Sequence, residues 1–266
     1  MKRTTDMKKI IETAEHLVDK DLVWKDAGWG GHGPVMNVHP IWWNFDGEVC
    51  VYANNCVALR VDPNNLSEFE EAKEKVKEWF RACKSVRDVL RYIRESYYED
   101  FIEEIKDMMS VDDLSKLIYS LWELPNKKEF RLLFSKDFFL EMFDTINLKA
   151  FMDDREYSTF ESLHNSGKEI ELFRGWGTDS DDSVGVEGSF SWALDEDELI
   201  EVGVWGRLGD INSAEDGEHE DARIYHAFIK GEDILAIYMG GSYTEAIVNP
   251  DKVYGVEAIG HFEWED

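Results

Sequence analysis

The sequence predicts an α+β fold, because its hydrophobic residues follow a helical period in the first part of the chain and alternate in the last part. Apolar positions three and four apart recur through residues 1–165, whereas short alternating segments separated by glycines and acidic turns begin near Ser166. We therefore expect a mainly helical region over residues 1–165 and a strand-rich domain over residues 166–266. A chain of 266 residues with 43% hydrophobic content can bury one large core or two modest ones.

Capping residues indicate where the helices of the first part begin. A serine followed three positions later by an acidic residue is typical of a helix start, and the pattern occurs at Ser67, Ser85 and Ser110. Pro125 should end the helix that Ser110 opens. The predicted helices cover residues 6–19, 68–83, 85–97 and 110–125, and roughly 127–134 and 136–147.

Extended segments are expected in both parts. In the first, glycines and a proline exclude a helix from residues 28–34, and residues 41–60 are strand-like around a turn at 44–47. Asp195 is expected to cap a helix that runs to about residue 206, and the acidic, glycine-rich residues 207–221 to form a mobile loop. The strands of the second part are expected within residues 169–177, 188–195, 224–229, 233–237 and 243–250.

The charge is strongly negative and unevenly distributed. The formal net charge is −28, and the sequence has 22 basic and 28 acidic residues in 1–150 against 7 and 29 in 151–266, so the two parts carry −6 and −22. Such a field repels phosphate backbones and offers no basic stripe for nucleic acid. It favours a cationic protein as the macromolecular partner.

Composition also indicates a compartment. No run of about 18 uncharged apolar residues is present to span a bilayer, and the amino terminus is charged rather than built like a signal peptide. Cys50, Cys56 and Cys83 are an odd number without the paired spacing of a zinc site, which is typical of reduced thiols. We therefore expect a cytoplasmic protein without a membrane partner.

Arg174 is the first of three residues with the chemistry to handle a dinucleotide. Alternation along its segment places it on the side opposite Phe173. A guanidinium offers donors that match phosphate oxygens, and the neighbouring Gly175 and Gly177 let backbone amides approach a ligand. The alternative is an exposed arginine paired with one of the many nearby carboxylates.

Ser191 is the second candidate, and Glu245 is the third. Ser191 lies at a strand-to-helix junction, where a hydroxyl and the ring of Trp192 can be presented beside a ribose or base; taken by itself, Trp192 is more typical of a core residue. Glu245 begins an apolar segment that ends at Pro250 and should form a central strand. A carboxylate there can bind a ribose hydroxyl and stabilise an oxocarbenium-like transition state, although a glutamate in so acidic a domain is most often solvated.

The order of these residues resembles the mono-ADP-ribosyltransferases of the Arg–Ser–Glu class. The resemblance covers about residues 168–257 and implies a split β-sandwich that holds NAD+ as co-substrate between two small sheets. Carried over by position, Glu245 is the catalytic residue. The segments that carry the resemblance are Leu172-Phe-Arg174-Gly, Gly188-Ser-Phe-Ser191-Trp, residues 224–229 with 233–237, and Glu245-Ala-Ile-Val-Asn-Pro.

The remaining residues of the resemblance are assigned to NAD+ binding. Arg174 is expected at the phosphates and ribose and Ser191 around the nicotinamide ribose, and Gly175, Trp192 and Tyr243 are further NAD+-binding residues. Two positions depart from the family pattern. Ala193 stands where a hydroxyl residue is usual, and Tyr243 stands where arginine-modifying members have a second glutamate, which makes arginine a less favoured acceptor residue.

The resemblance predicts an enzyme that cleaves the nicotinamide–ribose bond and transfers ADP-ribose to a macromolecule, in a toxin-like or phage-related role. The helical region would recognise the target or hold the enzyme inactive. An NAD+ glycohydrolase and a non-catalytic acidic binding protein of the same fold are the alternatives. No metal site is expected, because His32, His39 and His219 have no recognised ligand spacing.

Overall fold

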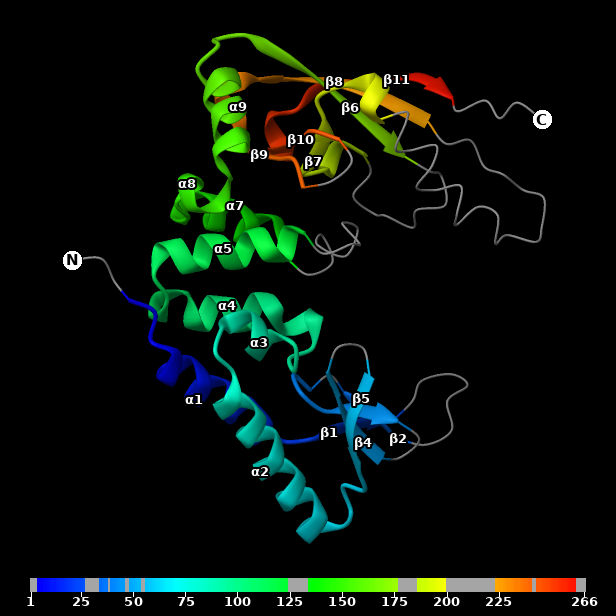
Figure 1. The fold of residues 1–266 in the computed structure, drawn as a ribbon. Helices are drawn as coiled ribbons and strands as arrows, with labels where there is room; N and C mark the ends of the chain where they lie inside the picture. The colour runs from blue at the N-terminus through cyan, green and yellow to red at the C-terminus, as the bar shows by residue number, and fades with distance from the viewer. Residues whose placement is uncertain are drawn as a thin grey trace. The chain divides into compact units, whose positions relative to one another are not determined.

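The chain forms two compact units, residues Met1–Ile146 and Asn147–Asp266, and both contain helices and strands in a computed structural model (Figure 1). The expected α+β class is confirmed. The turn after residue 45, the helix over 127–134, the continuation of the helix beyond residue 199 and the loop over 207–221 lie outside the described residues. The structure describes residues 4–26, 34–37, 39–45, 48–53, 56–123, 134–176, 186–199, 223–240 and 243–261.

Five helices of the amino-terminal unit begin at side-chain caps, the kind of start that the sequence predicts. Asp6, Asn65, Ser85, Ser110 and Ser135 each accept a hydrogen bond from a backbone N–H in the first turn that follows. The caps at Ser85 and Ser110 are therefore confirmed. The helices with these caps are α1 (Met7–Val18), α2 (Leu66–Ala82), α3 (Val86–Leu90), α5 (Val111–Trp122) and α7 (Lys136–Thr145), whereas α4 (Tyr98–Ile105) has no side-chain cap and was not predicted.

Two helix boundaries differ from the prediction. The cap of α2 is Asn65 rather than Ser67, because the Asn65 side chain exchanges hydrogen bonds with the backbone and side chain of Glu68. The helix opened by Ser85 was expected to continue to residue 97 but ends at Leu90. The chain turns there because the backbone N–H of Arg94 donates to the carbonyl of Pro40 at 2.8 Å instead of continuing the helix.

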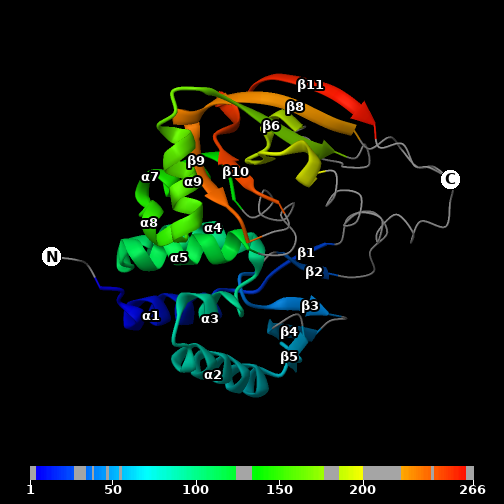
Figure 2. The ribbon, with the colours of Figure 1, turned by 45° about the horizontal axis from the view of Figure 1, so that its top comes forward.

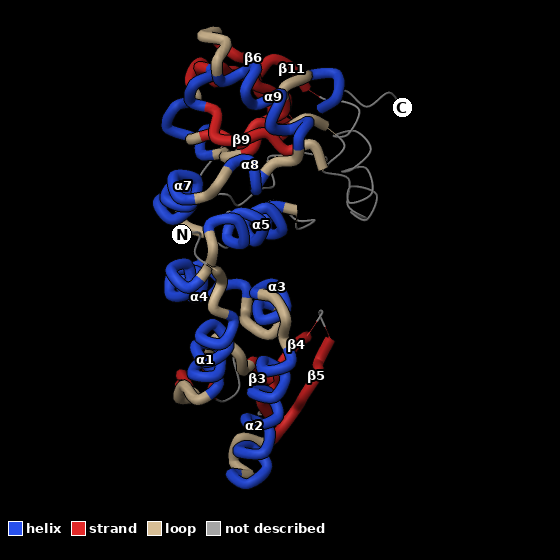
Figure 3. Tube along the Cα trace, turned by 60° about the vertical axis from the view of Figure 1, so that its left-hand side comes forward, coloured by secondary structure: helices blue, strands red, loops and turns tan. Residues whose placement is uncertain are grey.

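Strands of the amino-terminal unit form two small antiparallel sheets. The region 41–60 is confirmed as extended, and its central strand β4 has Val49 and Val51 fully buried. Helix α2 runs beside this sheet (Figure 3). The strands are β1 (Val23–Asp26) paired with β2 (Pro34–Asn37), and β3 (Trp43–Phe45), β4 (Glu48–Ala53) and β5 (Cys56–Val61) in the order β3-β4-β5.

The carboxy-terminal unit is built on a six-stranded antiparallel sheet in the order β11-β8-β6-β7-β10-β9 (Figure 2). Its first five strands in chain order lie at the segments that the sequence predicts, whereas no strand was predicted at the last one, β11. The six strands are β6 (Glu169–Trp176), β7 (Ser191–Ala193), β8 (Arg223–Lys230), β9 (Ile234–Tyr238), β10 (Glu245–Val248) and β11 (Tyr254–His261).

Two halves of this sheet meet at a single position. Strand β6 pairs with β8 along its whole length, but it pairs with β7 only through Phe173 and Ala193. Strand β7 then pairs with β10, and β10 with β9. The sheet therefore consists of a β11-β8-β6 half and a β7-β10-β9 half, joined by one residue pair at the centre.

The boundary between the units lies at residues 146 and 147 rather than near residue 165. Helices α8 (Leu148–Phe151) and α9 (Asp154–His164) belong with the carboxy-terminal sheet, because α9 packs on strand β9 and Sδ of Met152, the residue after α8, accepts from the N–H of Ile237 in β9. The buried carboxylate of Glu156 accepts hydrogen bonds from the backbone of Asp153 and of Met239, at 2.9 and 2.7 Å. These contacts over long sequence separations override the change of hydrophobic period on which the expected boundary rests.

Within the described part of the chain, no helix is both long enough and apolar enough to cross a membrane.

Candidate functional site

Ser191 and Glu245 contact each other at the centre of the carboxy-terminal sheet. Ser191 is the first residue of β7, and Glu245, the first residue of β10, stands directly opposite Ala193. Directly opposed residues of an antiparallel pair share a face, and so do residues two apart in one strand, so both side chains project from one face. The Ser191 hydroxyl donates a hydrogen bond to Oε1 of Glu245. Ser191 is 7% exposed and Glu245 0%.

Arg174, on the neighbouring strand β6, bonds to the backbone of Ser191. It lies one position after Phe173, where the pairing of β6 with β7 stops, and its side chain is on the side opposite Phe173, as alternation predicts. From there Nη1 donates to the backbone carbonyl of Ser191. The guanidinium thus links the two halves of the sheet just beyond their last backbone pair. The structure brings all three predicted residues, Arg174, Ser191 and Glu245, into one contiguous set of contacts.

Ser189 holds the Ser191 backbone from the other direction. Its hydroxyl donates to the Ser191 carbonyl at 3.1 Å, and its own carbonyl accepts from the indole nitrogen of Trp192 at 3.0 Å. Trp192 is 1% exposed and projects from the face of β7 opposite Ser191. Trp192 is therefore a core residue of the described fold; it lies on the same face of the sheet as the Arg174 side chain, and its assignment to NAD+ binding stays a prediction.

The residue before Glu245 is held at both of its backbone groups. The carbonyl of Thr244 accepts from the N–H of Leu194 at 3.1 Å, and its N–H donates to the carboxylate of Glu198 at 2.8 Å. Glu198 is itself placed by the predicted cap, since its N–H donates to Asp195 at 3.0 Å. The turn that follows β7 thereby fixes the start of β10, and with it the position of the Glu245 backbone.

Tyr243 and Gly175 lie beside this set. Tyr243 is partly buried and packs against a small cluster formed by Ala193, Leu199 and Ile224. Gly175 stands opposite Ile224 in the pairing of β6 with β8. Tyr243 therefore lies near Ala193, the residue opposite Glu245, and Gly175 directly follows Arg174 in β6. Gly177 lies outside the described residues.

Sequence reasoning did not assign Ser189 or Glu198 a part in the site. Ser189 precedes Ser191 by two positions, and this Ser-x-Ser spacing was the available signal. Glu198 follows the predicted cap Asp195 by three positions, a spacing that indicates only a helix start. Its bond to Thr244 joins positions 46 apart, and no local pattern marks such a contact.

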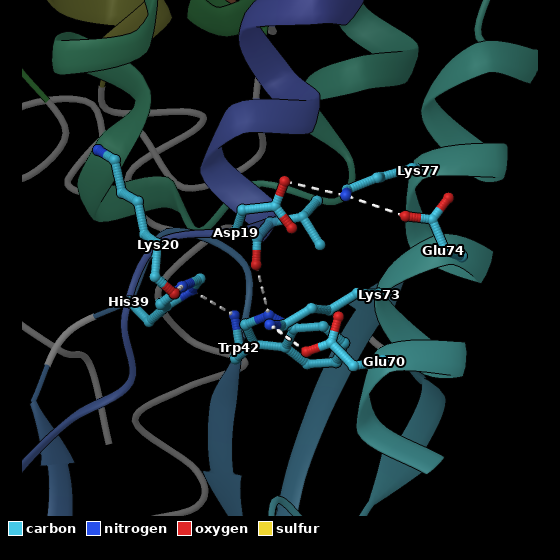
Figure 4. Close-up of polar contacts among 9 residues, drawn as sticks. Asp19, Lys20, His39, Trp42, Glu70, Lys73, Glu74 and Lys77 are labelled. Atoms are coloured by element: carbon cyan, nitrogen blue, oxygen red, sulfur yellow. Dashed lines mark hydrogen bonds and ion pairs between the residues drawn. The ribbon is translucent and has the colours of Figure 1, made fainter. Parts of the chain in front are cut away.

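His39 has both ring nitrogens bonded within the protein and is therefore not placed to bind a metal ion. Its ring is buried, Nδ1 accepts from the backbone N–H groups of Ile41 and Trp42 at 3.1 and 3.0 Å, and Nε2 lies 3.1 Å from the Lys20 carbonyl (Figure 4). Because Nδ1 is the acceptor, Nε2 carries the proton and donates. Burial lowers the pKa of His39 from 6.5 to about 4. Both ring nitrogens are thus used within the protein.

No cluster of histidine, cysteine, aspartate or glutamate suited to a metal ion occurs among the residues that the structure describes, while His32 and His219 lie outside them. The three cysteines are free, as expected. Burial raises the pKa of the Cys83 thiol to about 11 and also raises that of Cys50. Neither thiol is therefore activated as a nucleophile, since reactivity requires the thiolate.

No protein-family model matches the chain, and comparisons with curated proteins and with solved structures give no match.

Proposed function

We propose that the carboxy-terminal unit is an NAD+-dependent mono-ADP-ribosyltransferase domain with Glu245 as its catalytic residue. The observation that carries the proposal is the contact between the Ser191 hydroxyl and the Glu245 carboxylate, with Arg174 bonded to the same serine. The strands that bear these residues, β6, β7 and β10, are neighbours in the sheet. The near division of the sheet at Phe173 and Ala193 also agrees with the split β-sandwich that the resemblance implies.

The chemistry of the three residues fits the cleavage of NAD+. The bond between the ribose C1′ and the nicotinamide nitrogen breaks, and its electron pair leaves with neutral nicotinamide. A carboxylate next to the sugar stabilises the positive charge that develops on the ribose, and it is most effective where water is excluded, as at the buried Glu245. A nucleophile of the acceptor then forms a bond to C1′ and loses its proton.

Ser191 and Arg174 have supporting roles in this proposal. The Ser191 hydroxyl holds one carboxylate oxygen of Glu245 in a fixed direction, so that the carboxylate does not reorganise during the reaction. Arginine carries five N–H donors in a planar arrangement suited to phosphate oxygens, and the Arg174 bond to the Ser191 carbonyl fixes that arrangement. In a unit of such negative charge, this guanidinium would counter the repulsion of the pyrophosphate.

Access to Glu245 is a physical requirement of the proposal. Because the carboxylate is 0% exposed, NAD+ must displace neighbouring side chains to reach it. Hydrogen exchange of the backbone in β7 and β10 should therefore change when NAD+ is added, whereas α1 of the other unit should keep its exchange rates. Unaltered exchange throughout at saturating NAD+ would show that the nucleotide does not enter this site.

The decisive experiment measures the release of labelled nicotinamide and the binding of NAD+ in matched variants. Glu245→Gln should lower turnover at least about 100-fold with NAD+ affinity largely kept, because the loss of the charge affects mainly the transition state. The exposed Glu232→Gln is the control for charge in the same unit and should retain full activity. Undiminished nicotinamide release by Glu245→Gln would remove this residue from the mechanism.

Arg174→Ala separates binding from chemistry. It should mainly weaken NAD+ affinity, by about tenfold or more, because a charge-assisted contact to phosphate contributes roughly 1.5–3 kcal/mol. Calorimetric titration of NAD+ into the variant gives the dissociation constant directly. An unchanged constant would place the phosphates elsewhere.

Tyr243 favours hydrolysis as a second candidate function. Where arginine-modifying members of the family have a second glutamate, this chain has a tyrosine that packs into a hydrophobic cluster, so the acceptor position is not built for arginine. Incubation with labelled NAD+ and a cell lysate distinguishes the outcomes. Label on a macromolecule indicates transfer, free ADP-ribose indicates a glycohydrolase, and neither product indicates a non-catalytic binding protein.

A further inference from the structure

One face of the β11-β8-β6 half of the sheet carries a row of aromatic rings. Phe173 stands opposite His226, and Phe228 stands opposite Tyr254, so the four side chains share a face. Neighbouring ring centroids lie 5.2 Å apart for Phe173 and His226, 4.5 Å for His226 and Phe228, and 6.2 Å for Phe228 and Tyr254. The row therefore crosses all three strands, which lie side by side in Figure 2.

Toward β11 this face is the outer one of the half-sheet, whereas Phe173 at its other end packs against the buried cluster of Ala193, Leu199 and Ile224. The alternate residues Leu172, Ala227 and Ile229 are 0% exposed and form the core side. On the outer side Tyr254 is 42% exposed, and Phe173, His226 and Phe228 are each partly exposed. An antiparallel sheet with one buried face usually presents polar residues on the other. A continuous row of aromatic rings on that face indicates an interaction surface for another molecule.

Carboxylates surround the rings on the same face. Glu171 stands opposite Phe228, Glu257 stands opposite His226, and both are exposed. Glu169 accepts a hydrogen bond from the Tyr254 hydroxyl, and Nε2 of His226 lies 3.9 Å from Oε1 of Glu171. By register, Lys230, opposite Glu169, is the one cation that the described strands place on this face. Three carboxylates against one ammonium make the face acidic.

The row of rings points to the same side of the sheet as the candidate catalytic residue. Phe173 stands opposite Ala193, and Ala193 stands opposite Glu245, so the row continues in register across β7 to β10. Because Ala193 and Glu245 are themselves buried, a partner on the exposed rings would lie on the same side of the sheet as Glu245 without contacting its carboxylate. Such a position suits a macromolecule that would accept the ADP-ribosyl group in the proposed reaction.

We propose that the outer face, defined by Phe173, His226, Phe228 and Tyr254 with Glu169, Glu171 and Glu257, docks a basic segment of the acceptor protein. Lysine and arginine side chains are attracted both to the faces of aromatic rings and to carboxylates, so this combination selects cations. Nucleic acid and anionic membranes are repelled by the same charges, and a second copy of the face would repel itself. Identification of the partner as the acceptor depends on the proposed transferase function; the docking itself does not.

Direct binding tests the docking without NAD+. The probe is a labelled peptide of alternating arginine and serine, titrated with the full chain at physiological ionic strength and followed by fluorescence anisotropy. The variant Glu171→Gln/Glu257→Gln should bind about tenfold more weakly. Its matched control, Glu71→Gln/Glu78→Gln on the exposed side of α2, changes the net charge equally and should stay within about twofold of the parent protein.

A neutral substitution tests the rings separately from the charges. Tyr254→Ala removes an exposed ring and should weaken peptide binding about three- to fivefold, in line with a cation–π contribution at a partly exposed site. Equal effects of the two glutamine pairs would mean general attraction by a negatively charged protein. That result, or parent-like binding by both outer-face variants, overturns the docking surface.

Turnover measurements separate this inference from the proposed function. If both hold, Glu171→Gln/Glu257→Gln raises the KM for a protein acceptor while NAD+ hydrolysis in its absence is unchanged. Peptide binding that is lost in the variants, in a protein that never consumes NAD+, sustains the docking surface and rejects the transferase. NAD+-dependent labelling with the same acceptor KM in parent and variants supports the transferase and rejects the docking surface.

Discussion

The Ser191 hydroxyl and the Glu245 carboxylate meet on one face of two antiparallel strands, although 54 positions separate them in the chain. The contact is diagonal, because Glu245 stands opposite Ala193 and Ser191 precedes Ala193 by two residues. Both side chains are buried, so each supplies a polar partner that water cannot replace. A change at either residue should therefore alter the other.

Ser191→Ala should lower NAD+ turnover by roughly 10- to 100-fold while the dissociation constant of NAD+ changes little. A hydrogen bond to a charged group contributes about 1.5–3 kcal/mol, and 1.4 kcal/mol corresponds to a tenfold change. Nicotinamide release and calorimetry measure the two quantities. Ser191→Thr keeps a hydroxyl and should retain most of the activity that the alanine variant loses.

A double-mutant cycle checks that the two residues act together. Once Glu245→Gln has removed the charge, Ser191→Ala should have little further effect on turnover, because residues that act as a unit are strongly non-additive. Full additivity of the two substitutions would show that Ser191 supports the reaction independently of Glu245.

The strands and helix caps were largely predictable, because both depend on local patterns. Alternation identified β6 and predicted that the side chains of Arg174 and Phe173 project from different faces of the sheet. The caps at Ser85 and Ser110 were found from residues three positions apart. The order of Arg174, Ser191 and Glu245 pointed to a site, but their contacts depend on strand neighbours that the sequence does not state. The cap of α2 was misassigned because a turn before it brings Asn65, not Ser67, to the helix start.

Long-range polar contacts explain what the sequence did not predict. The bonds from Glu198 to Thr244 and from Glu156 to Met239 join positions 46 and 83 apart. Each involves a glutamate that, read locally, is only a helix-start residue. Such a residue acquires its second role from the tertiary fold, so the attachment of α9 to the sheet, and with it the unit boundary, could not be derived from periodicity.

Glu156→Gln should destabilise the carboxy-terminal unit by about 1–3 kcal/mol. One carboxylate oxygen accepts from Asp153 and the other from Met239, and an amide would turn its NH2 group toward one of these N–H donors. Denaturant unfolding, with hydrogen exchange to localise the effect in α9 and β9, measures the change. Glu161→Gln on the exposed side of the same helix is the control and should lie within about 0.5 kcal/mol of the parent protein.

Fragments should distinguish the two positions proposed for the unit boundary. A chain of residues 147–266 keeps α8 and α9 with the sheet and should unfold cooperatively on heating. A chain of residues 166–266 lacks Glu156 and the buried Phe160, exposes apolar surface, and should aggregate or show no cooperative transition. Circular dichroism and sedimentation check both fragments. Equal cooperativity in the two would return the boundary to the period change near Ser166.

His39 should make the amino-terminal unit less stable in mild acid. Its folded pKa is held near 4 by burial, against an ordinary value of 6.5, so below pH 6.5 the unfolded chain binds a proton that the folded chain does not. The free energy of unfolding is therefore unaffected by His39 above pH 6.5. It falls as the pH drops toward 4, by up to about 3 kcal/mol at 1.36 kcal/mol per pH unit.

The comparison that isolates His39 is the difference in unfolding free energy between parent and variant from pH 7 to pH 4. An asparagine at this position can still accept the N–H groups of Ile41 and Trp42 but does not titrate, so His39→Asn should be the less stable protein at pH 7 and lose less stability on acidification. His16→Asn, at an exposed position of α1, should follow the parent curve. Parallel curves for His39→Asn and the parent would mean that His39 is not kept neutral by the fold.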